Sequence, residues 1–257
     1  MEHRTGHPVV EVWVHGEGPF QFVLDTCAGG HGRIDNRLAE RLGLEDAGVV
    51  RMGDGTGVNE REGRLVRVEA LTVGDAAFEG LTMLVRNEED LGGKLARGIL
   101  GYGLFEQLLL TLDYPESKLR LSNGNLSDED PHTVPVFTTM GVPEIDIRIG
   151  SESMRAHVDS GNMGGLTLPG HYKDTLELAG ELVSAGRGQT LLNDFEVLSA
   201  PLANPLVLGT HRLDKTKASF IEIFRSANLG YSVLSEFALS FDQRSGRASF
   251  VPRAKGH

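Results

Sequence analysis

The sequence predicts an all-β-dominated fold made of two similar halves, with only short helices. Glycine accounts for 33 of the 257 residues, about twice its usual share of roughly 7%, and it is spread along the whole chain. Between glycine-containing turns lie short segments in which apolar and polar residues alternate, as in strands with one buried face. These segments recur in the same order in each half. Many short strands joined by many turns explain both observations.

The first half opens with a predicted hairpin whose second strand ends in an acidic residue. In residues 10–15, valine alternates with Glu11, Trp13 and His15, and residues 20–24 form an apolar strand that runs directly into Asp25. A short helix is expected at 36–42, ended by Gly43. Further strand patterns follow at 65–71, 78–85, 108–112 and 118–121.

The second half repeats this order at fixed spacings. Asp25 and Asp159 are 134 residues apart, and so are Gly16 and Gly150 in the turns before them. At a second spacing, of 129 residues, three more features coincide: Gly101-Tyr102 with Gly230-Tyr231, Asp113 with Asp242, and Leu110 with Leu239. These coincidences indicate an internal duplication, with one repeat in each half.

A repeat of this length indicates two similar lobes, because arrays of small units repeat every roughly 20–50 residues. The stretch between the halves is rich in Asn, Asp, Ser, Gly and Pro, as connectors are. We therefore expect an N-terminal lobe at 1–125, a connector at 126–133 and a C-terminal lobe at 134–257. Since one chain supplies both lobes, we expect a monomer.

Charge and composition argue against several classes of function. The formal net charge of -11 disfavours a nucleic-acid partner, because phosphate binding needs clustered Lys and Arg. No apolar run approaches the roughly 18 residues of a membrane span, and residues 1–10 lack the apolar core of a signal peptide. The single cysteine, Cys27, cannot form an intrachain disulfide. A cytoplasmic location is expected, or a periplasmic or secreted one if a signal peptide has been removed.

Both halves carry an apolar strand that ends in Asp, a hydroxyl residue and a small residue: Asp25-Thr26-Cys27 and Asp159-Ser160-Gly161. Downstream apolar–Gly elements follow at 98–102 and 228–230, and an Asp-Tyr-Pro turn at 113–115. This combination resembles the aspartic peptidases of the retroviral and pepsin types, and most of all the bacterial retropepsin-like aspartyl proteases. The resemblance covers nearly the whole chain. It implies a bilobed acid-protease fold with two retropepsin-like β-barrel lobes.

The resemblance implies that Asp25 and Asp159 hydrolyse peptide bonds by activating a water molecule. Two carboxyls held a few ångströms apart do not both ionise readily, so one keeps a proton that the other loses. The ionised one acts as general base on the water, and the protonated one donates toward the amide oxygen. Because the pair titrates jointly, neither role is assigned to one residue. The expected substrate is a peptide or protein in extended conformation, and no cofactor or metal is expected.

Other site residues follow from the same resemblance. Thr26 and Ser160 are expected to hydrogen-bond between the lobes, with Cys27 and Gly161 supporting the two loops. The stretch Gly53, Asp54, Gly55, Thr56 and Gly57 is expected to form a flap over the substrate, since glycine permits positive φ and mobility. An ordinary hairpin turn is the alternative for that stretch, as a turn or cap role is for a single aspartate.

The main departure from the family pattern is Cys27, where the family has glycine. Three interpretations stay open: a small packed side chain, an impaired or redox-sensitive peptidase, and a thiol nucleophile assisted by His31. The sequence therefore leaves two main functions from different classes. One is an aspartic endopeptidase, and the other is a catalytically impaired homologue that binds peptide or protein partners in the same cleft.

Overall fold

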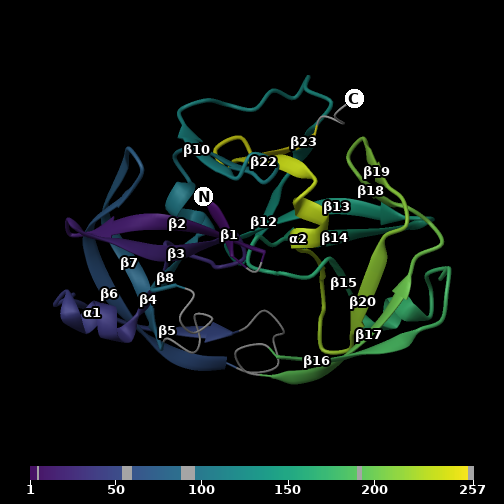
Figure 1. Cartoon of the computed structure of the whole chain (residues 1–257), viewed down its shortest axis with the longest axis horizontal. Helices are drawn as coiled ribbons and strands as arrows, with labels where there is room; N and C mark the ends of the chain where they lie inside the picture. The colour runs from purple at the N-terminus through teal and green to yellow at the C-terminus, as the bar shows by residue number, and fades with distance from the viewer. Residues whose placement is uncertain (5, 54–59, 88–95, 190–192, 254–257) are drawn as a thin grey trace.

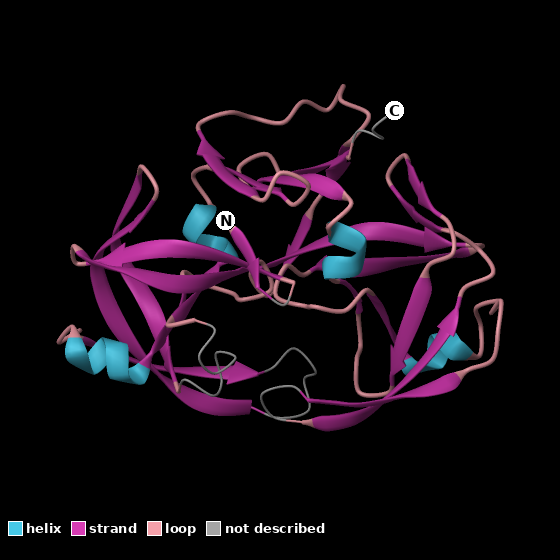
Figure 2. Ribbon diagram, viewed as in Figure 1, coloured by secondary structure: helices cyan, strands magenta, loops and turns pink. Residues whose placement is uncertain are grey.

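β-strands dominate the computed structural model, and the helices are few and short (Figure 2). The structure describes residues 1–4, 6–53, 60–87, 96–189 and 193–253. Within these residues the strands form three sheets (Figure 1). The first is built from the first half of the chain, the second from the second half, and the third combines strands of both halves. The predicted all-β fold class is therefore confirmed.

The first sheet is built from the first half of the chain and carries Asp25. Its strand order is β1-β2-β3-β8-β4-β7-β6-β5. The predicted hairpin is formed by β2 and β3, and β3 then runs parallel to β8, so that Asp25 lies beside Gly101. The strands are β1 (Glu2–Arg4), β2 (His7–Val14), β3 (Glu17–Asp25), β4 (Gly32–Asp35), β5 (Asp46–Gly53), β6 (Glu60–Val73), β7 (Ala76–Arg86) and β8 (Gly98–Gly101).

The second sheet is built from the second half and carries the strand before Asp159. Its order is β16-β17-β20-β15-β21-β14-β13-β18-β19, and β12 pairs with β13. Here β13 and β14 form the hairpin, and β14 runs parallel to β21, as β3 does to β8. The strands are β12 (Phe137–Thr139), β13 (Val142–Ile149), β14 (Glu152–Val158), β15 (Leu166–Pro169), β16 (Val183–Gln189), β17 (Asp194–Pro201), β18 (Leu206–Leu208), β19 (His211–Leu213), β20 (Lys217–Ile221) and β21 (Ala227–Leu229).

The third sheet takes strands from both halves and lies across the top of the molecule in Figure 1, in the order β10-β9-β22-β23-β11. Its central pair is antiparallel and places Thr111 beside Ser240. Strand β11 begins at Thr133, so the last residue of the predicted connector is in a strand; the domain boundaries stay a prediction. The strands are β9 (Leu109–Asp113), β10 (Lys118–Ser122), β11 (Thr133–Pro135), β22 (Phe237–Asp242) and β23 (Arg247–Pro252).

The expected helix near residue 36 is present as α1 (Asn36–Arg41). Its N-cap is Asp35, whose Oδ2 accepts a hydrogen bond from the Leu38 N–H over 3.2 Å and so satisfies one of the free donors of the first turn. Gly43, at φ +60°, follows the helix and lets the chain turn away. Among the described residues, the other helical segments are η3 (Tyr102–Phe105), η4 (Gly170–Lys173) and α2 (Tyr231–Leu234).

Buried apolar side chains form a core cluster with members in all three sheets, among them Leu24, Val158 and Phe241. Burying one such side chain contributes about 1.5–3 kcal/mol. A smaller apolar cluster lies apart from it in the first half and consists of Val9, Val23, Ala96 and the adjoining Ile99. The strand that carries Asp25 therefore contacts apolar clusters on both of its faces, because successive residues point to opposite sides.

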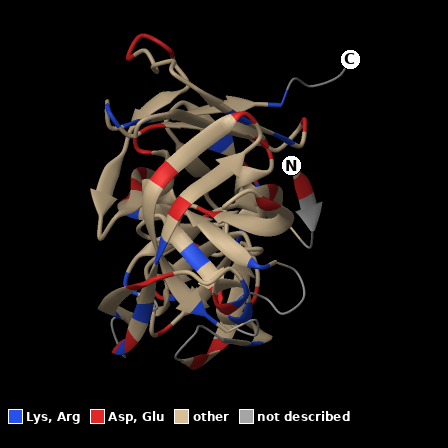
Figure 3. Ribbon diagram, turned by 90° about the vertical axis from the view of Figure 1, so that its left-hand side faces the viewer, with Lys and Arg blue, Asp and Glu red and all other residues tan. Residues whose placement is uncertain are grey.

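Acidic and basic residues are interspersed on the face shown in Figure 3 rather than separated by sign. Exposed pairs such as Arg41 with Glu17, 2.7 Å apart, contribute little stability because water screens them. Interspersed charge of this kind favours solubility. In the part of the chain that the structure describes, no helix is long and apolar enough to cross a membrane.

Candidate active site

The two predicted catalytic aspartates stand at equivalent places, each at the end of a strand with a buried apolar residue before it. Asp25 is the last residue of β3, and Asp159 directly follows β14. A parallel neighbour fixes each strand end. Strand β8 lies beside Asp25, and the Asp159 N–H donates to the carbonyl of Leu229 in β21 over 2.9 Å. The sheets therefore fix the position at which each aspartate loop begins.

Two buried hydroxyl groups join the loops reciprocally. The Thr26 N–H donates to Ser160 Oγ over 2.9 Å, and the Ser160 N–H donates to Thr26 Oγ1 over 3.0 Å. Each hydroxyl then donates to a main-chain carbonyl of the other half: Thr26 to Val158 over 2.5 Å, and Ser160 to Leu24 over 2.8 Å. These four bonds connect the residues on either side of both aspartates, so they fix one loop against the other.

Each aspartate receives a main-chain hydrogen bond within its own loop. The Cys27 N–H donates to Asp25 Oδ1 over 2.8 Å, and the Gly161 N–H donates to Asp159 Oδ1 over 2.9 Å. Gly161 also lies against the opposite carboxyl, since a Cβ at this position would come within 2.5 Å of Asp25 Cγ. Only glycine leaves room for Asp25 there, and this contact brings Asp25 directly onto the loop of Asp159.

The two carboxyls are also coupled electrostatically. Burial raises the pKa of Asp159 to about 7, and the negative charge of Asp25 contributes to the rise, while hydrogen bonds from Asn228, Gly161 and Asn162 oppose it. Burial likewise raises the pKa of Tyr114, with smaller contributions from Asp159 and other nearby groups. The loops therefore form a poorly solvated site in which adding a second negative charge is unfavourable.

This raised pKa predicts a pH-dependent stability. The unfolded chain ionises Asp159 near its ordinary pKa of 3.8, whereas the folded chain keeps the proton up to about pH 7. Unfolding therefore releases a proton between these values, so the contribution of Asp159 to stability is largest below pH 3.8 and is lost as the pH rises through 7. Relative to Asp159→Asn, the wild type should lose up to about 4 kcal/mol of unfolding free energy between pH 4 and 8.

Urea unfolding at several pH values measures this loss. Asp75→Asn, in the exposed turn between β6 and β7, is the matched control and should follow the wild type. Parallel curves for the wild type and Asp159→Asn would contradict the assignment.

Cys27 places a side chain where the other loop has Gly161. Its Sγ lies 3.9 Å from the carbonyl oxygen of Val158. Burial raises the pKa of the thiol, and the charges of Asp159 and Asp25 raise it further, so the thiol stays protonated at neutral pH. His31 is directed elsewhere, because its Nδ1 accepts a hydrogen bond from the Thr82 N–H over 3.0 Å. These observations argue against a thiolate nucleophile.

The expected flap lies largely outside the described residues. Gly53 ends β5, where it pairs with Glu60 of β6, and Asp54, Gly55, Thr56 and Gly57 belong to the part that is not described. The flap therefore stays a prediction.

A polar pair near Asp159 was not anticipated. Asn228 donates to Asp159 Oδ2 over 2.6 Å, and Asn162 donates to Asn228 Oδ1 over 2.7 Å. The sequence held a signal for it, since Asn228 takes the first apolar place of the element at 228–230. Without the strand register, nothing indicated that this side chain would reach Asp159.

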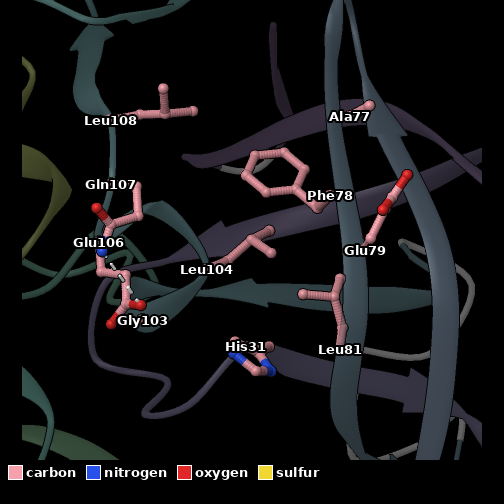
Figure 4. Close-up of a pocket in the computed structure, with 10 residues that line it drawn as sticks. All are labelled: His31, Ala77, Phe78, Glu79, Leu81, Gly103, Leu104, Glu106, Gln107 and Leu108. Atoms are coloured by element: carbon pink, nitrogen blue, oxygen red, sulfur yellow. Dashed lines mark hydrogen bonds between the residues drawn. The ribbon is translucent and has the colours of Figure 1, made fainter.

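A separate hollow of about 370 Å³ lies away from the aspartates (Figure 4). Phe78 and Leu81 of β7 line one side, Leu104 and Leu108 line the other, and His31 lies at the edge. Neither Asp25 nor Asp159 contributes to it. Within the described residues, no group of three or more His, Cys, Asp or Glu side chains is arranged to hold a metal ion.

A family model described as aspartyl protease matches residues 10–104, which include Asp25 and the strands on either side of it. No curated protein gives a significant match to the chain. The first half is thus similar to the aspartyl proteases, which supports an aspartic peptidase class for the chain in general terms.

Proposed function

We propose that this protein is a single-chain aspartic endopeptidase in which Asp25 and Asp159 together activate a water molecule to hydrolyse peptide bonds. The observation that carries the proposal is the reciprocal bonding of Thr26 and Ser160. It brings two equivalent acidic loops together from opposite halves of the chain. A turn or capping role for two separate aspartates does not require such a junction.

The local chemistry fits this reaction. Burial of the site, together with the negative charge of Asp25, raises the pKa of Asp159. The pair therefore retains one proton at pH values well above the ordinary pKa of a carboxyl. A pair that holds one proton contains both a base for the water and an acid for the amide oxygen. The two carboxyls titrate together, so the acid and base roles belong to the pair.

The proposal includes an internal duplication with one lobe from each half, and two contacts between equivalent positions support it. Thr26 and Ser160, which are 134 residues apart, bond to each other, and Thr111 and Ser240, which are 129 apart, pair directly across β9 and β22. Equivalent positions that meet each other are expected around a local two-fold axis. One chain then supplies both loops, so a monomer is sufficient for the proposed site.

Cleavage of a denatured protein between pH 3 and 8, with and without a statine-type inhibitor, tests the proposal. An endopeptidase of this mechanism releases internal fragments, and the inhibitor blocks their release. A polypeptide in extended conformation is the proposed substrate, held by strand-like hydrogen bonds. Absence of cleavage over the whole pH range would contradict the proposal.

The second candidate is a catalytically impaired homologue that binds peptides, and Cys27 is the observation that favours it. Cys27→Gly separates the two, because glycine keeps the N–H that donates to Asp25 Oδ1 and removes the thiol near Asp159. For an active endopeptidase we expect kcat/KM of this variant within about tenfold of the wild type. An inactive wild type with an active Cys27→Gly variant would favour the impaired homologue.

A further inference from the structure

Three neighbouring strand positions beside each aspartate carry apolar side chains in the first half and polar side chains in the second half. In each half, the first position pairs with the second, and the second pairs in parallel register with the third. The first half has Val9, Val23 and Ile99 at these positions, and the second half has Glu144, His157 and Asn228. An apolar cluster beside Asp25 is thus replaced by polar groups beside Asp159.

The orientation of the Asn228 amide follows from a chain of hydrogen bonds. The Gly164 N–H can only donate, and it lies 2.7 Å from Asn162 Oδ1. Asn162 therefore presents Nδ2 to Asn228 Oδ1 at 2.7 Å, which turns Nδ2 of Asn228 toward Asp159 Oδ2 at 2.6 Å. A main-chain group thus fixes both amides, and Oδ2 of Asp159 is the acceptor at the end of the chain.

This chain of hydrogen bonds gives the two carboxyls different numbers of hydrogen-bond donors. Asp159 accepts an N–H donor on each oxygen, from Gly161 on Oδ1 and from Asn228 on Oδ2. Asp25 accepts the Cys27 N–H on Oδ1, and the equivalent of Asn228 beside it is Ile99, whose side chain has no donor. Donors to both oxygens stabilise an ionised carboxylate and restrict its rotation.

We propose that Asn228 is a positioning residue that, held by Asn162, fixes the orientation of the Asp159 carboxyl and stabilises its ionised form. Its catalytic meaning rests on the proposed endopeptidase function. Its effect on the protonation of Asp159 does not depend on that function. Asn228 thereby lowers the pH up to which the pair still holds its proton.

Other groups around Asp159 act on the same equilibrium. The charge of Asp25 favours the protonated form of Asp159, and the neutral thiol of Cys27 and the buried Tyr114 lie close enough to sense the Asp159 charge. His157 is adjacent to Asn228 and faces Glu144, with 3.5 Å between Nε2 and Oε1. Burial lowers the pKa of His157 below its ordinary value of 6.5, so its ring is mainly neutral when the pH is above 6.5.

Titration of the carboxyl carbons by NMR on aspartate-labelled protein tests the proposal. The Asp159 signal is assigned by its loss in Asp159→Asn. In Asn228→Ile, which copies Ile99, the midpoint of the Asp159 titration should rise by about one to two pH units. The alkaline limb of the pH–activity profile should move up with it. Asn228→Ala provides the same measurement if the isoleucine variant does not fold.

Asn125→Ile, an exposed substitution at the end of the predicted N-terminal lobe, is the matched control and should leave the titration midpoint and activity unchanged. An unchanged Asp159 midpoint in the Asn228 variants would overturn the proposal, whether or not the protein cleaves peptides. A raised midpoint in a protein without peptidase activity would instead uphold the role of Asn228 and remove the proposed function. The two failures are therefore distinguishable.

Discussion

Replacing either Asp25 or Asp159 by asparagine is expected to lower kcat/KM for a denatured protein substrate by about 10³-fold or more. Asparagine has nearly the same shape and can still accept the loop N–H on its Oδ1. It can neither take a proton from water nor donate one as a carboxyl does. The pair would then lack one of its two functions, whichever residue is changed. Initial rates at the optimal pH, measured with each purified variant, give the result.

Two controls separate chemistry from folding. Asp75→Asn makes the same change in an exposed turn and should keep full activity. The thermal midpoints of Asp25→Asn and Asp159→Asn should stay near or above that of the wild type, because each change removes an ionisable carboxyl, and with it the unfavourable second negative charge, from a poorly solvated pair. Full activity in both single variants would rule out the dyad mechanism, and unfolding of both would show that the pair is mainly structural.

The sequence predicted the local elements that depend on short-range patterns. Alternating residues gave the hairpin of β2 and β3, and the strand that ends at Asp25 followed from its apolar run. The helix near residue 36 was found because Gly43 marks its end. These features depend on neighbouring residues only, so one sequence is enough to find them.

Features that depend on register between distant strands were not predictable. The bond from Asn228 to Asp159 requires that β14 and β21 run parallel with His157 beside Asn228, and no local pattern reports this. The shared sheet is similar, since β9 and β22 are far apart in the chain. The helical segment η4 that follows β15 stays short, because Pro169 and Gly170 disfavour a longer helix.

The second large effect is expected where the hydroxyl groups of Thr26 and Ser160 are removed. Thr26→Val leaves the carbonyl of Val158 and the N–H of Ser160 without these partners in a buried site. Each unsatisfied group costs about 1–3 kcal/mol, so the variant should lose about 2–5 kcal/mol of unfolding free energy. Ser160→Ala should lose a similar amount, because it leaves Leu24 and Thr26 in the same condition.

The double variant shows whether the two hydroxyls act as one junction. If they hold the same two loops together, its loss should be at least about 1 kcal/mol smaller than the sum of the single losses, since residues that share a network are not additive. Thr111→Val with Ser240→Ala is the matched control, because these partly buried hydroxyls bond to each other across β9 and β22, 2.8 Å apart. Urea unfolding should give that pair about 1 kcal/mol in total. Equal, additive losses of unfolding free energy at both sites would mean that the loops do not depend on this junction. Peptidase activity that survives in the Thr26 and Ser160 double variant would mean that the aspartates need no support from these hydroxyls.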